Sequence, residues 1–560
     1  MDRVQLPIGI SDFEEIRSKG YYYVDKSGLI QELLRTEGTK VMLFTRPRRF
    51  GKTLGMHMLA SFFDVRKNSK ELFQGLEITK NIELCKKWMN QYPVLFLSFK
   101  DVDGLEFSGG YGMLFMAVAN LFKEHLYLLD SVRIDDFSKK SFLKIVEGSA
   151  TVSDIKGSLF LLMRMMENHY GKKVILILDE YDVPIAKASS KGYYDEMLDV
   201  IRGILSMVLK DNSSLQMAVI TGCLRIARES IFTGANNFKV DTISDNRYDE
   251  YFGFTHKEIK KILADIGMES HLQKVKQWYD GYHFGDVDVY CPWDVLNYAD
   301  KVIVQGITKP ENFWAHTSDN AVIGQFLKRT DIDVTEKFEK LLDGGYIKER
   351  INENLTYHML MSSEENFWSL LYMTGYLTRV KPEKIKTEDR LDENSVALRI
   401  PNAEVMEIFR NSSVEWLREK LLENDRRILF ETLWEGLDEK LTEMLSDLLF
   451  DTISFHDYAE SFYHAFVTGL VAGAGYIVES NYENGMGRSD IVIKDRRNRR
   501  AVVIEAKVAV SEEGLEKACR EALHQIDEKQ YARKIERSGF RKVICYGIAF
   551  YKKSCLVKRK

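Results

Sequence analysis

A short apolar run followed by a basic loop and a Gly-Lys-Thr triplet most constrains the fold of this chain. Residues 41–45, VMLFT, have the length and apolarity of a buried strand. The loop RPRRFG ends at Gly51, and a helical pattern begins at Lys52. A strand, a loop and a helix in this order can bind phosphate through backbone N–H groups and the helix N-terminus. The sequence therefore predicts a phosphate-binding loop at this position.

The loop has the ending of the P-loop motif GxxxxGK[ST]. In that motif the lysine contacts the β- and γ-phosphates and the hydroxyl contacts Mg²⁺. Arg46 stands where the first glycine belongs, and glycine there permits a tight turn. The departure therefore bears on the loop geometry and on hydrolysis. The residues expected to bind nucleotide here are Arg48, Arg49, Phe50, Gly51, Lys52 and Thr53, with Thr53 also a metal ligand.

A second motif, VILILDEYD, follows further along the chain. Five consecutive apolar residues, Val174–Leu178, suit the middle of a parallel sheet that is covered on both faces. Asp179 at the end of this run would hold the Mg²⁺ shell, and Glu180 would polarise the attacking water. The alternative is that these are solvated acids at the end of a strand.

The next predicted strand, Met217–Thr221, ends on a hydroxyl residue. A polar side chain at a neighbouring strand tip can sense the γ-phosphate, so Thr221 is a candidate nucleotide ligand. Arg225 and Arg228 follow, and an arginine can stabilise charge during phosphoryl transfer. Ordinary surface arginines are the alternative. An arginine that acts toward a neighbouring chain would make the protein a homo-oligomer, which stays possible.

The order of the predicted elements divides the chain into four parts. Strands alternate with helices over 1–254, which predicts a doubly wound α/β domain. The pattern over 255–400 is mostly helical and suggests a lid or winged-helix module. A charged helical connector is expected over 401–454, and a second α/β domain over 455–560. The elements expected in this second domain are helices over 456–472 and 512–535 and strands over 476–480, 490–494, 501–508 and 543–550.

Several longer segments resemble the AAA-ATPase-like family: LPIGISDFEEIRSKGYYYVDKSGLI, LFTRPRRFGKTLGMHML, ILDEYDVPI and ITGCLRIARESIF. The similarity continues through NRYDEYFGFT and WYDGYHFG to PWDVLNY, and covers residues 4–300. In that family arginine typically replaces the first loop glycine, so Arg46 follows the family pattern. The resemblance implies ATP as the nucleotide. It also implies a C-terminal PD-(D/E)XK nuclease-superfamily domain, which members often carry.

Residues 488–507, RSDIVIKDRRNRRAVVIEAK, are the chemically informative part of the C-terminal region. Asp490 opens one predicted strand, and Glu505 and Lys507 share one face of the next. A hairpin could bring Asp490 opposite Glu505, and two carboxylates suit Mg²⁺, which prefers oxygen ligands. Lys507 could then orient the attacking water. A cross-strand ion pair is the alternative.

The block over 455–550 resembles the PD-(D/E)XK nuclease-superfamily domain. Ser489 replaces the proline of the motif, a position that tolerates substitution in the superfamily. The resemblance implies a catalytic set with supporting positions on the flanking helices. These residues are Asp490, Glu505 and Lys507, supported by Glu460 as a further metal ligand and by Gln525. For Glu460, a solvent-facing acid on a helix is the alternative.

Composition limits the partners and the location. The formal net charge of -5 excludes a polycation, so nucleic acid would contact local basic patches such as Lys494–Arg500, for which an ordinary charged β-turn is the alternative. The basic end of the chain, Lys558–Lys560, is interpreted as a solvated tail. Six scattered cysteines without a CxxC pair argue against a zinc or disulfide framework. The N-terminus has no signal-peptide pattern, and no apolar stretch is long enough to span a bilayer. We therefore expect a cytoplasmic protein without membrane contact.

These observations predict an ATP-binding and ATP-hydrolysing protein coupled to a Mg²⁺-dependent nuclease that acts on nucleic-acid phosphodiesters. One alternative is a nucleotide-dependent switch whose nuclease-like domain is a non-catalytic binding module. The other is an ATPase whose C-terminal domain is structural.

Overall fold

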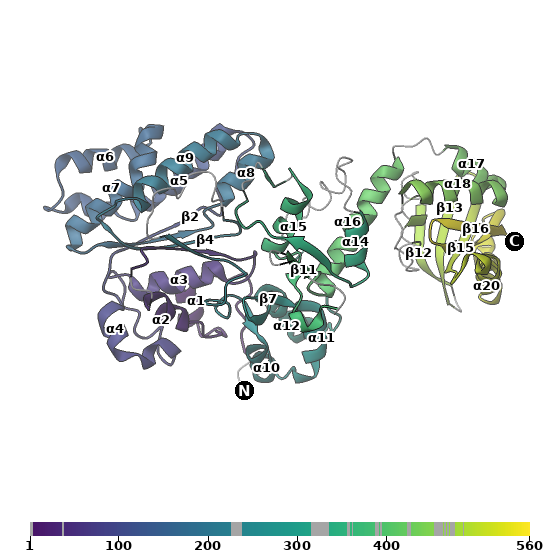
Figure 1. The fold of residues 1–560 in the computed structure, drawn as a ribbon, viewed down its shortest axis with the longest axis horizontal. Coiled ribbons are helices and arrows are strands. Elements are labelled where there is room, and N and C mark those ends of the chain that lie inside the picture. The colour runs from purple at the N-terminus through teal and green to yellow at the C-terminus, as the bar shows by residue number, and fades with distance from the viewer. Residues whose placement is uncertain are drawn as a thin grey trace. The chain divides into compact units, whose positions relative to one another are not determined.

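A computed structural model describes most of the chain, and Figure 1 shows its fold. It covers residues 4–560 apart from 36–37, 226–237, 315–334, 356–358, 361, 387–390, 393–394, 423–426, 453–462, 464–465, 468–469, 471–476 and 485–486. The chain divides into two compact units. The first is Met1–Ser318 with Lys348–Val405, and the second is Asp319–Ile347 with Met406–Lys560. The finer division into four domains stays a prediction.

The first unit is built on a five-stranded parallel sheet. In spatial order its strands are β2 (Val94–Ser98), β3 (Val174–Asp179), β4 (Leu215–Gly222), β1 (Val41–Thr45) and β5 (Phe238–Asp241). Every residue of β1 and β3 is buried, as expected of strands covered on both faces. The predicted α/β fold is therefore confirmed.

Helices cover both faces of this sheet (Figure 1). On one side lie α1 (Phe13–Ser18), α2 (Gly28–Leu34), α3 (Lys52–Phe63) and α4 (Ile82–Trp88). On the other side lie α5 (Phe107–Lys123), α6 (Asp136–Val146), α7 (Val152–Tyr170), α8 (Val183–Lys191) and α9 (Tyr194–Leu209). Most of these helices bury apolar residues in the layers beside the sheet, whereas α4 has no buried residue.

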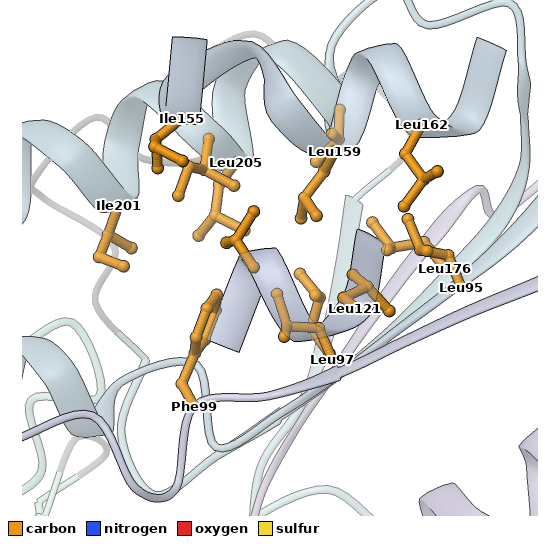
Figure 2. Packing of buried hydrophobic residues seen from close by; sticks show 14 of the residues in the cluster. Leu95, Leu97, Phe99, Leu121, Ile155, Leu159, Leu162, Leu176, Ile201 and Leu205 are labelled. Atoms are coloured by element: carbon orange, nitrogen blue, oxygen red, sulfur yellow. The ribbon is translucent and has the colours of Figure 1, made fainter. Parts of the chain in front are cut away.

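Figure 2 shows the packing on the second of these faces. Ile155, Leu159 and Leu162 recur at helical spacing on α7 and point toward the sheet. Leu97 and Leu176 meet them from β2 and β3. Burying one such side chain fully stabilises the fold by about 1.5–3 kcal/mol. The core is thus large enough to hold the sheet edge, where the polar residues lie, in a fixed geometry.

Local signals set the ends of α7. Thr151 accepts a hydrogen bond from the N–H of Asp154, and the Asp154 carboxylate accepts one from the N–H of Thr151. This capping box satisfies two N–H groups that the helix itself cannot. Gly171 ends the helix at φ 67°, a conformation that glycine adopts without strain.

All five strands are parallel, so their carboxyl ends meet at one edge of the sheet. β1 leads into the loop at 46–51, β3 ends on Asp179, and β5 ends on Asp241. Because β4 lies between β1 and β3, Thr221 near its end lies between the loop and Asp179. Ligands of such sheets bind at this edge.

The middle of the chain is helical, as predicted, with two small sheets between the helices. The helices are α10 (His256–Asp265), α11 (Leu272–Tyr279), α12 (Pro292–Gln305), α14 (Thr335–Leu342), α15 (Glu364–Met373) and α16 (Ala403–Leu422). One sheet has the order β6 (Phe254–Thr255), β8 (Val287–Tyr290), β7 (Tyr282–Phe284). The other has the order β10 (Thr378–Arg379), β11 (Ser395–Arg399), β9 (Ile347–Arg350). Strands this short show too little alternation to be recognised in a sequence.

The second unit contains a mixed five-stranded sheet. Its order is β12 (Ile477–Asn484), β13 (Gly487–Asp495), β14 (Arg500–Val508), β15 (Lys542–Tyr551) and β16 (Ser554–Arg559). Only β14 and β15 are parallel, and α20 (Leu515–Glu528) and α21 (Tyr531–Arg537) connect them. Helices α17 (Arg427–Glu435) and α18 (Asp438–Thr452) contribute to a core with the sheet.

The sequence predicted four of these five strands, and the differences are local. The helix expected over 512–535 is two helices, α20 and α21. The basic end of the chain, interpreted as a solvated tail, is the edge strand β16. The helix expected over 456–472 lies largely outside the described residues. No helix in the described ranges combines the length and the apolarity that crossing a bilayer requires.

Candidate functional site

The loop between β1 and α3 begins with a backbone hydrogen bond to the neighbouring strand. The N–H of Arg46 donates to the carbonyl of Gly222 at 3.1 Å. Arg49 has φ 73°, which is uncommon for a residue with a side chain. Gly51 has φ 85° and caps α3, and no atom lies within 4 Å of where its Cβ would be. Glycine is therefore suited to this position by backbone conformation rather than by lack of space.

Lys52 is the first residue of α3, and its side chain turns back into the loop. It is 4% exposed, and its Nζ donates to the carbonyls of Arg46 and Pro47 at 2.9 Å each. The N-terminal end of a helix carries partial positive charge and unpaired N–H groups. The ammonium group and the helix end together make a positive site that suits phosphate.

Asp179 collects hydroxyl groups from three elements at the sheet edge. Its carboxylate, 0% exposed, accepts from Thr53 Oγ1 at 2.9 Å and from Thr221 Oγ1 at 2.6 Å. Ser98 Oγ, at the end of β2, donates to it at 3.3 Å. Carboxylate and hydroxyl oxygens are ligands that Mg²⁺ accepts, so the donor set fits this ion. Ser98 was not predicted, and its place at the end of a strand is the signal that could have identified it.

Glu180 lies beside this cluster in an unusual backbone conformation. Its φ is 53°, and its N–H donates to Thr221 Oγ1 at 3.2 Å. Burial raises the pKa of the Glu180 carboxyl group, while the nearby Lys52 ammonium opposes the shift. A carboxylate whose pKa is raised toward neutral pH suits a general base.

The guanidinium of Arg46, the residue in place of glycine, lies against the end of β5. It is 0% exposed and donates to Asp241 Oδ1 at 2.5 Å and to the Asp241 carbonyl at 3.0 Å. Its Cζ lies 5.3 Å and 5.7 Å from the ring centroids of Phe252 and Phe284. The arginine thus anchors the loop to the end of β5. Asp241 was not predicted, because it lies 195 residues from Arg46 in the chain.

The remaining predicted loop residues differ in their surroundings. Phe50 is buried, and its ring lies 4.9 Å from that of Tyr282, so only its backbone is placed to contact a nucleotide. The Arg49 guanidinium stacks on Trp293 at 4.2 Å. Arg48 is half-buried. A nucleotide contact for each of these three residues stays a prediction.

The segment after β4 is held by an acid of the DEYD motif. Asp182 is buried, and its Oδ2 accepts the N–H groups of Cys223 and Leu224 at 2.9 and 3.0 Å. No role was predicted for Asp182, the last acid of the motif. Arg225 follows in the same loop and is half-buried, and its role stays a prediction. Arg228 lies outside the described residues.

In the second unit, Glu505 and Gln525 are hydrogen-bonded to each other. Glu505 is 0% exposed on β14, and Gln525 Nε2 on α20 donates to its Oε1. Lys507, two residues later on the same strand, is half-buried. Alternation along the strand places Glu505 and Lys507 on one face of the sheet, the face that α20 covers.

The backbone also places Asp490 near this position. Ile491 on β13 pairs with Ile504 on β14, so Asp490 and Glu505 each lie one residue beyond that pair on adjacent strands. The side chain of Asp490 and the whole of Glu460 are outside the described residues. No group of three or more metal-binding side chains was found within the described part of the chain. Among the described side chains of this site, the Glu505 carboxylate is a suitable metal ligand, and the complete ligand set stays a prediction.

Comparison with known families identifies two domains in the chain. Residues 7–232 match the family described as "Predicted AAA-ATPase", and residues 458–560 match the PD-(D/E)XK nuclease superfamily. The chain joins an AAA-ATPase-like domain to a PD-(D/E)XK nuclease-superfamily domain. Both predicted resemblances are therefore confirmed.

A curated relative matches about half of this chain. It is a protein of Azotobacter chroococcum mcd 1 described as "Uncharacterized protein in vnfD 5'region", 29% identical over 304 residues. The match covers 53% of this chain and 52% of that protein. The chain thus spans about half of the length of this relative.

The region that follows the AAA-ATPase-like domain contains a buried pair of acids. Asp294 on α12 and Glu404 on α16 are both fully buried and hydrogen-bonded to each other. Neither Asp294 oxygen nor Glu404 Oε2 receives an N–H or O–H from another described group. Glu404 Oε1 accepts the N–H groups of Phe313 and Trp314. Two buried like charges in contact are strongly unfavourable, so we expect the two carboxyl groups to share one proton.

We expect Glu404→Gln to stabilise the first unit increasingly as the pH rises. Burial, reinforced by Asp294, raises the pKa of Glu404 well above its usual range. The stability from the bound proton is complete below about pH 4.3 and is lost as the pH rises through the raised pKa. The amide keeps the acceptor and donates permanently to Asp294. Urea unfolding between pH 5 and 8 measures the difference, with a gain of about 1–3 kcal/mol at pH 8.

Glu407→Gln, an exposed position on the same helix, is the matched control. Stability curves that stay parallel for wild type and Glu404→Gln over this pH range would show that no shared proton is present.

Proposed function

We propose that this protein binds and hydrolyses ATP at the edge of its N-terminal sheet and cleaves nucleic-acid phosphodiesters in its C-terminal domain with Mg²⁺. The observation that carries the proposal is the contact of Thr53 and Thr221 with Asp179, next to the buried ammonium of Lys52. This arrangement joins a phosphate-binding group to an oxygen donor set within one water-excluding edge.

The residues of the N-terminal site would divide the work as follows. Lys52 would exchange its two loop carbonyls for phosphate oxygens of ATP. Thr53 and Asp179 would hold the magnesium ion, which when bound neutralises phosphate charge. Glu180 would orient the attacking water and accept its proton. Thr221 Oγ1 accepts the backbone N–H of Glu180 and so keeps that residue in position.

The residues of the C-terminal site would cleave a phosphodiester. Asp490 and Glu505 would hold a metal ion, which when bound supplies Lewis-acid stabilisation of the developing charge. Lys507 would orient the attacking water. Gln525 fixes the direction of the Glu505 carboxylate through its hydrogen bond, as groups behind a metal ligand commonly do.

We expect Lys507→Ala to reduce cleavage by about 10²–10⁴-fold, the range for a residue that takes part in proton transfer or water activation. The measurement is cleavage of labelled single- and double-stranded DNA and RNA with Mg²⁺ or Mn²⁺, with and without ATP. Lys517→Ala, an exposed lysine on α20, is the matched control and should cleave as wild type does.

Equal cleavage by Lys507→Ala and wild type would assign the activity to a contaminant and remove the nuclease from the proposal. Absence of cleavage together with nucleic-acid binding would favour a non-catalytic binding module in its place.

A further inference from the structure

Two segments that are far apart in the sequence meet at one end of the C-terminal sheet. The turn between β13 and β14 holds Arg499, whose carbonyl accepts the N–H groups of Arg541 and Lys542 at 2.7 and 3.4 Å. Arg500 and Lys542 then pair as the first residues of the parallel strands β14 and β15. The turn and the connection between α21 and β15 therefore lie side by side.

These two segments concentrate positive charge. Residues 496–499 and 536–542 contain six arginine or lysine residues and one carboxylate, Glu536. The whole chain has a formal net charge of -5, so this concentration does not follow from composition. Clustered like charges repel one another in the folded state, and bound anions relieve that repulsion.

Some of the cations in this region stabilise the fold. The Arg500 Nε donates to Asp495 at 2.8 Å, and its guanidinium stacks on Trp434 at 4.3 Å. Lys542 donates to the Trp434 carbonyl at 2.8 Å. Asp495 also accepts the N–H and side-chain amide of Asn498. Asp495, the acid next to the turn, thus already accepts three hydrogen bonds from Asn498 and Arg500.

The other arginines are exposed and take no part in these contacts. We call them the basic turn cluster; they are Arg496, Arg497, Arg499, Arg537 and Arg541. None of them forms an ion pair with a carboxylate among the described residues. Arg499 has φ 51°, so the turn holds its backbone in a conformation that residues other than glycine rarely adopt. The cluster presents several guanidinium groups to solvent on a braced backbone.

We infer that the basic turn cluster binds the phosphate backbone of nucleic acid at a distance from the cleavage groups. Guanidinium groups bind phosphate in a bidentate manner, and sequence-independent binding rests on such contacts. Five residues of β14 separate Arg500 from Glu505, which is about 17 Å at 3.3 Å per residue. At 3.4 Å per nucleotide, the contacts lie about five base pairs from the scissile bond. The inference rests on the proposed function, since it adds a backbone-binding region for the substrate of that domain.

The test compares binding by two variants that each lose three positive charges. One is Arg496→Gln/Arg497→Gln/Arg541→Gln, which spares Arg500 and Lys542. The other is Lys257→Gln/Lys260→Gln/Lys261→Gln, which removes exposed lysines of α10 in the first unit. Both are made in the full chain carrying Lys507→Ala and measured in EDTA, so that cleavage does not interfere.

Fluorescence anisotropy with labelled single- and double-stranded DNA and RNA gives the affinity. We expect the arginine variant to bind at least about tenfold more weakly, with a slope of log K against log salt that is less steep by about two to three. The lysine variant should bind as the parent does. Circular dichroism and thermal unfolding establish that both variants are folded.

Equal affinities and salt slopes for the two variants would overturn the inference, as would absence of binding by the parent at low salt. Displacement of the oligonucleotide by polyglutamate at lower concentrations than by unlabelled DNA or RNA would assign the cluster to an acidic polypeptide and also overturn it. The arginine substitutions can also be made in the chain that keeps Lys507. If that variant cleaves as the wild type does, while Lys507→Ala does not cleave, the nuclease proposal stays intact. If binding depends on the arginines but the wild type does not cleave, the inference about the basic turn cluster is supported and the nuclease proposal fails.

Discussion

Glu180→Gln is expected to bind ATP as the wild type does and to hydrolyse it about 10²–10⁴-fold more slowly. The amide keeps the size and the position of the side chain. The backbone N–H of residue 180, which donates to Thr221 Oγ1, helps to fix this position. The substitution removes the ability to accept a proton from water. Steady-state hydrolysis and equilibrium binding of ATP measure the two effects separately.

The pH dependence gives a second readout of the same residue. Since burial raises the pKa of Glu180, the wild-type rate should fall on the acid side at a pH above 4.3, about the usual pKa of glutamate. The deprotonated form is the base, so the rate is lost as the pH falls through the raised pKa. The variant should lack this acid limb. Glu196→Gln, an exposed position on α9, is the control. Unchanged turnover in Glu180→Gln would remove this residue from its assigned role.

Arg46→Gly, which restores the glycine of the general motif, is expected to destabilise the first unit by about 3–5 kcal/mol. The change leaves Asp241 buried without its cation and opens a cavity between Phe252 and Phe284. Nucleotide binding should weaken as well, because the loop loses its anchor to β5. Urea unfolding measures the loss.

The double variant Arg46→Met/Asp241→Leu provides the comparison. Replacing both members of a buried ion pair by apolar residues of similar volume is often neutral or stabilising. We expect it to regain most of the stability that Arg46→Gly loses. A glycine variant as stable as the wild type would show that the buried pair contributes nothing to the loop.

The parts of the fold that sequence predicted well are those with an uninterrupted local signal. The apolar runs of β1 and β3 and the loop that ends at Gly51 each carry their own pattern within ten residues or fewer. The proximity of Thr53 and Asp179 follows from a rule of topology, because parallel strands deliver their carboxyl ends to one edge. These local and topological signals were sufficient to predict that Thr53 and Asp179 lie close together at one edge of the sheet.

The contacts that sequence did not predict join distant segments without a motif. Arg46 and Asp241 meet only because β1 and β5 are neighbours, and the segment FKVD that holds Asp241 has nothing unusual in it. Asp294 and Glu404 pair across the middle region in the same way. The edge strand β16 was missed because SCLVKR is too polar and basic to predict a strand. In each case the tertiary partner, rather than the local pattern, determines the structure.

Calorimetric titration of the protein with ATP in the presence of Mg²⁺ tests the central claim most directly, namely that Lys52, Thr53 and Asp179 form one nucleotide site. We predict saturable heat for the wild type, none for Lys52→Ala, and heat close to wild type for the control Lys100→Ala, an exposed lysine. Absence of saturable heat in the wild type, or equal binding by Lys52→Ala, would contradict the account.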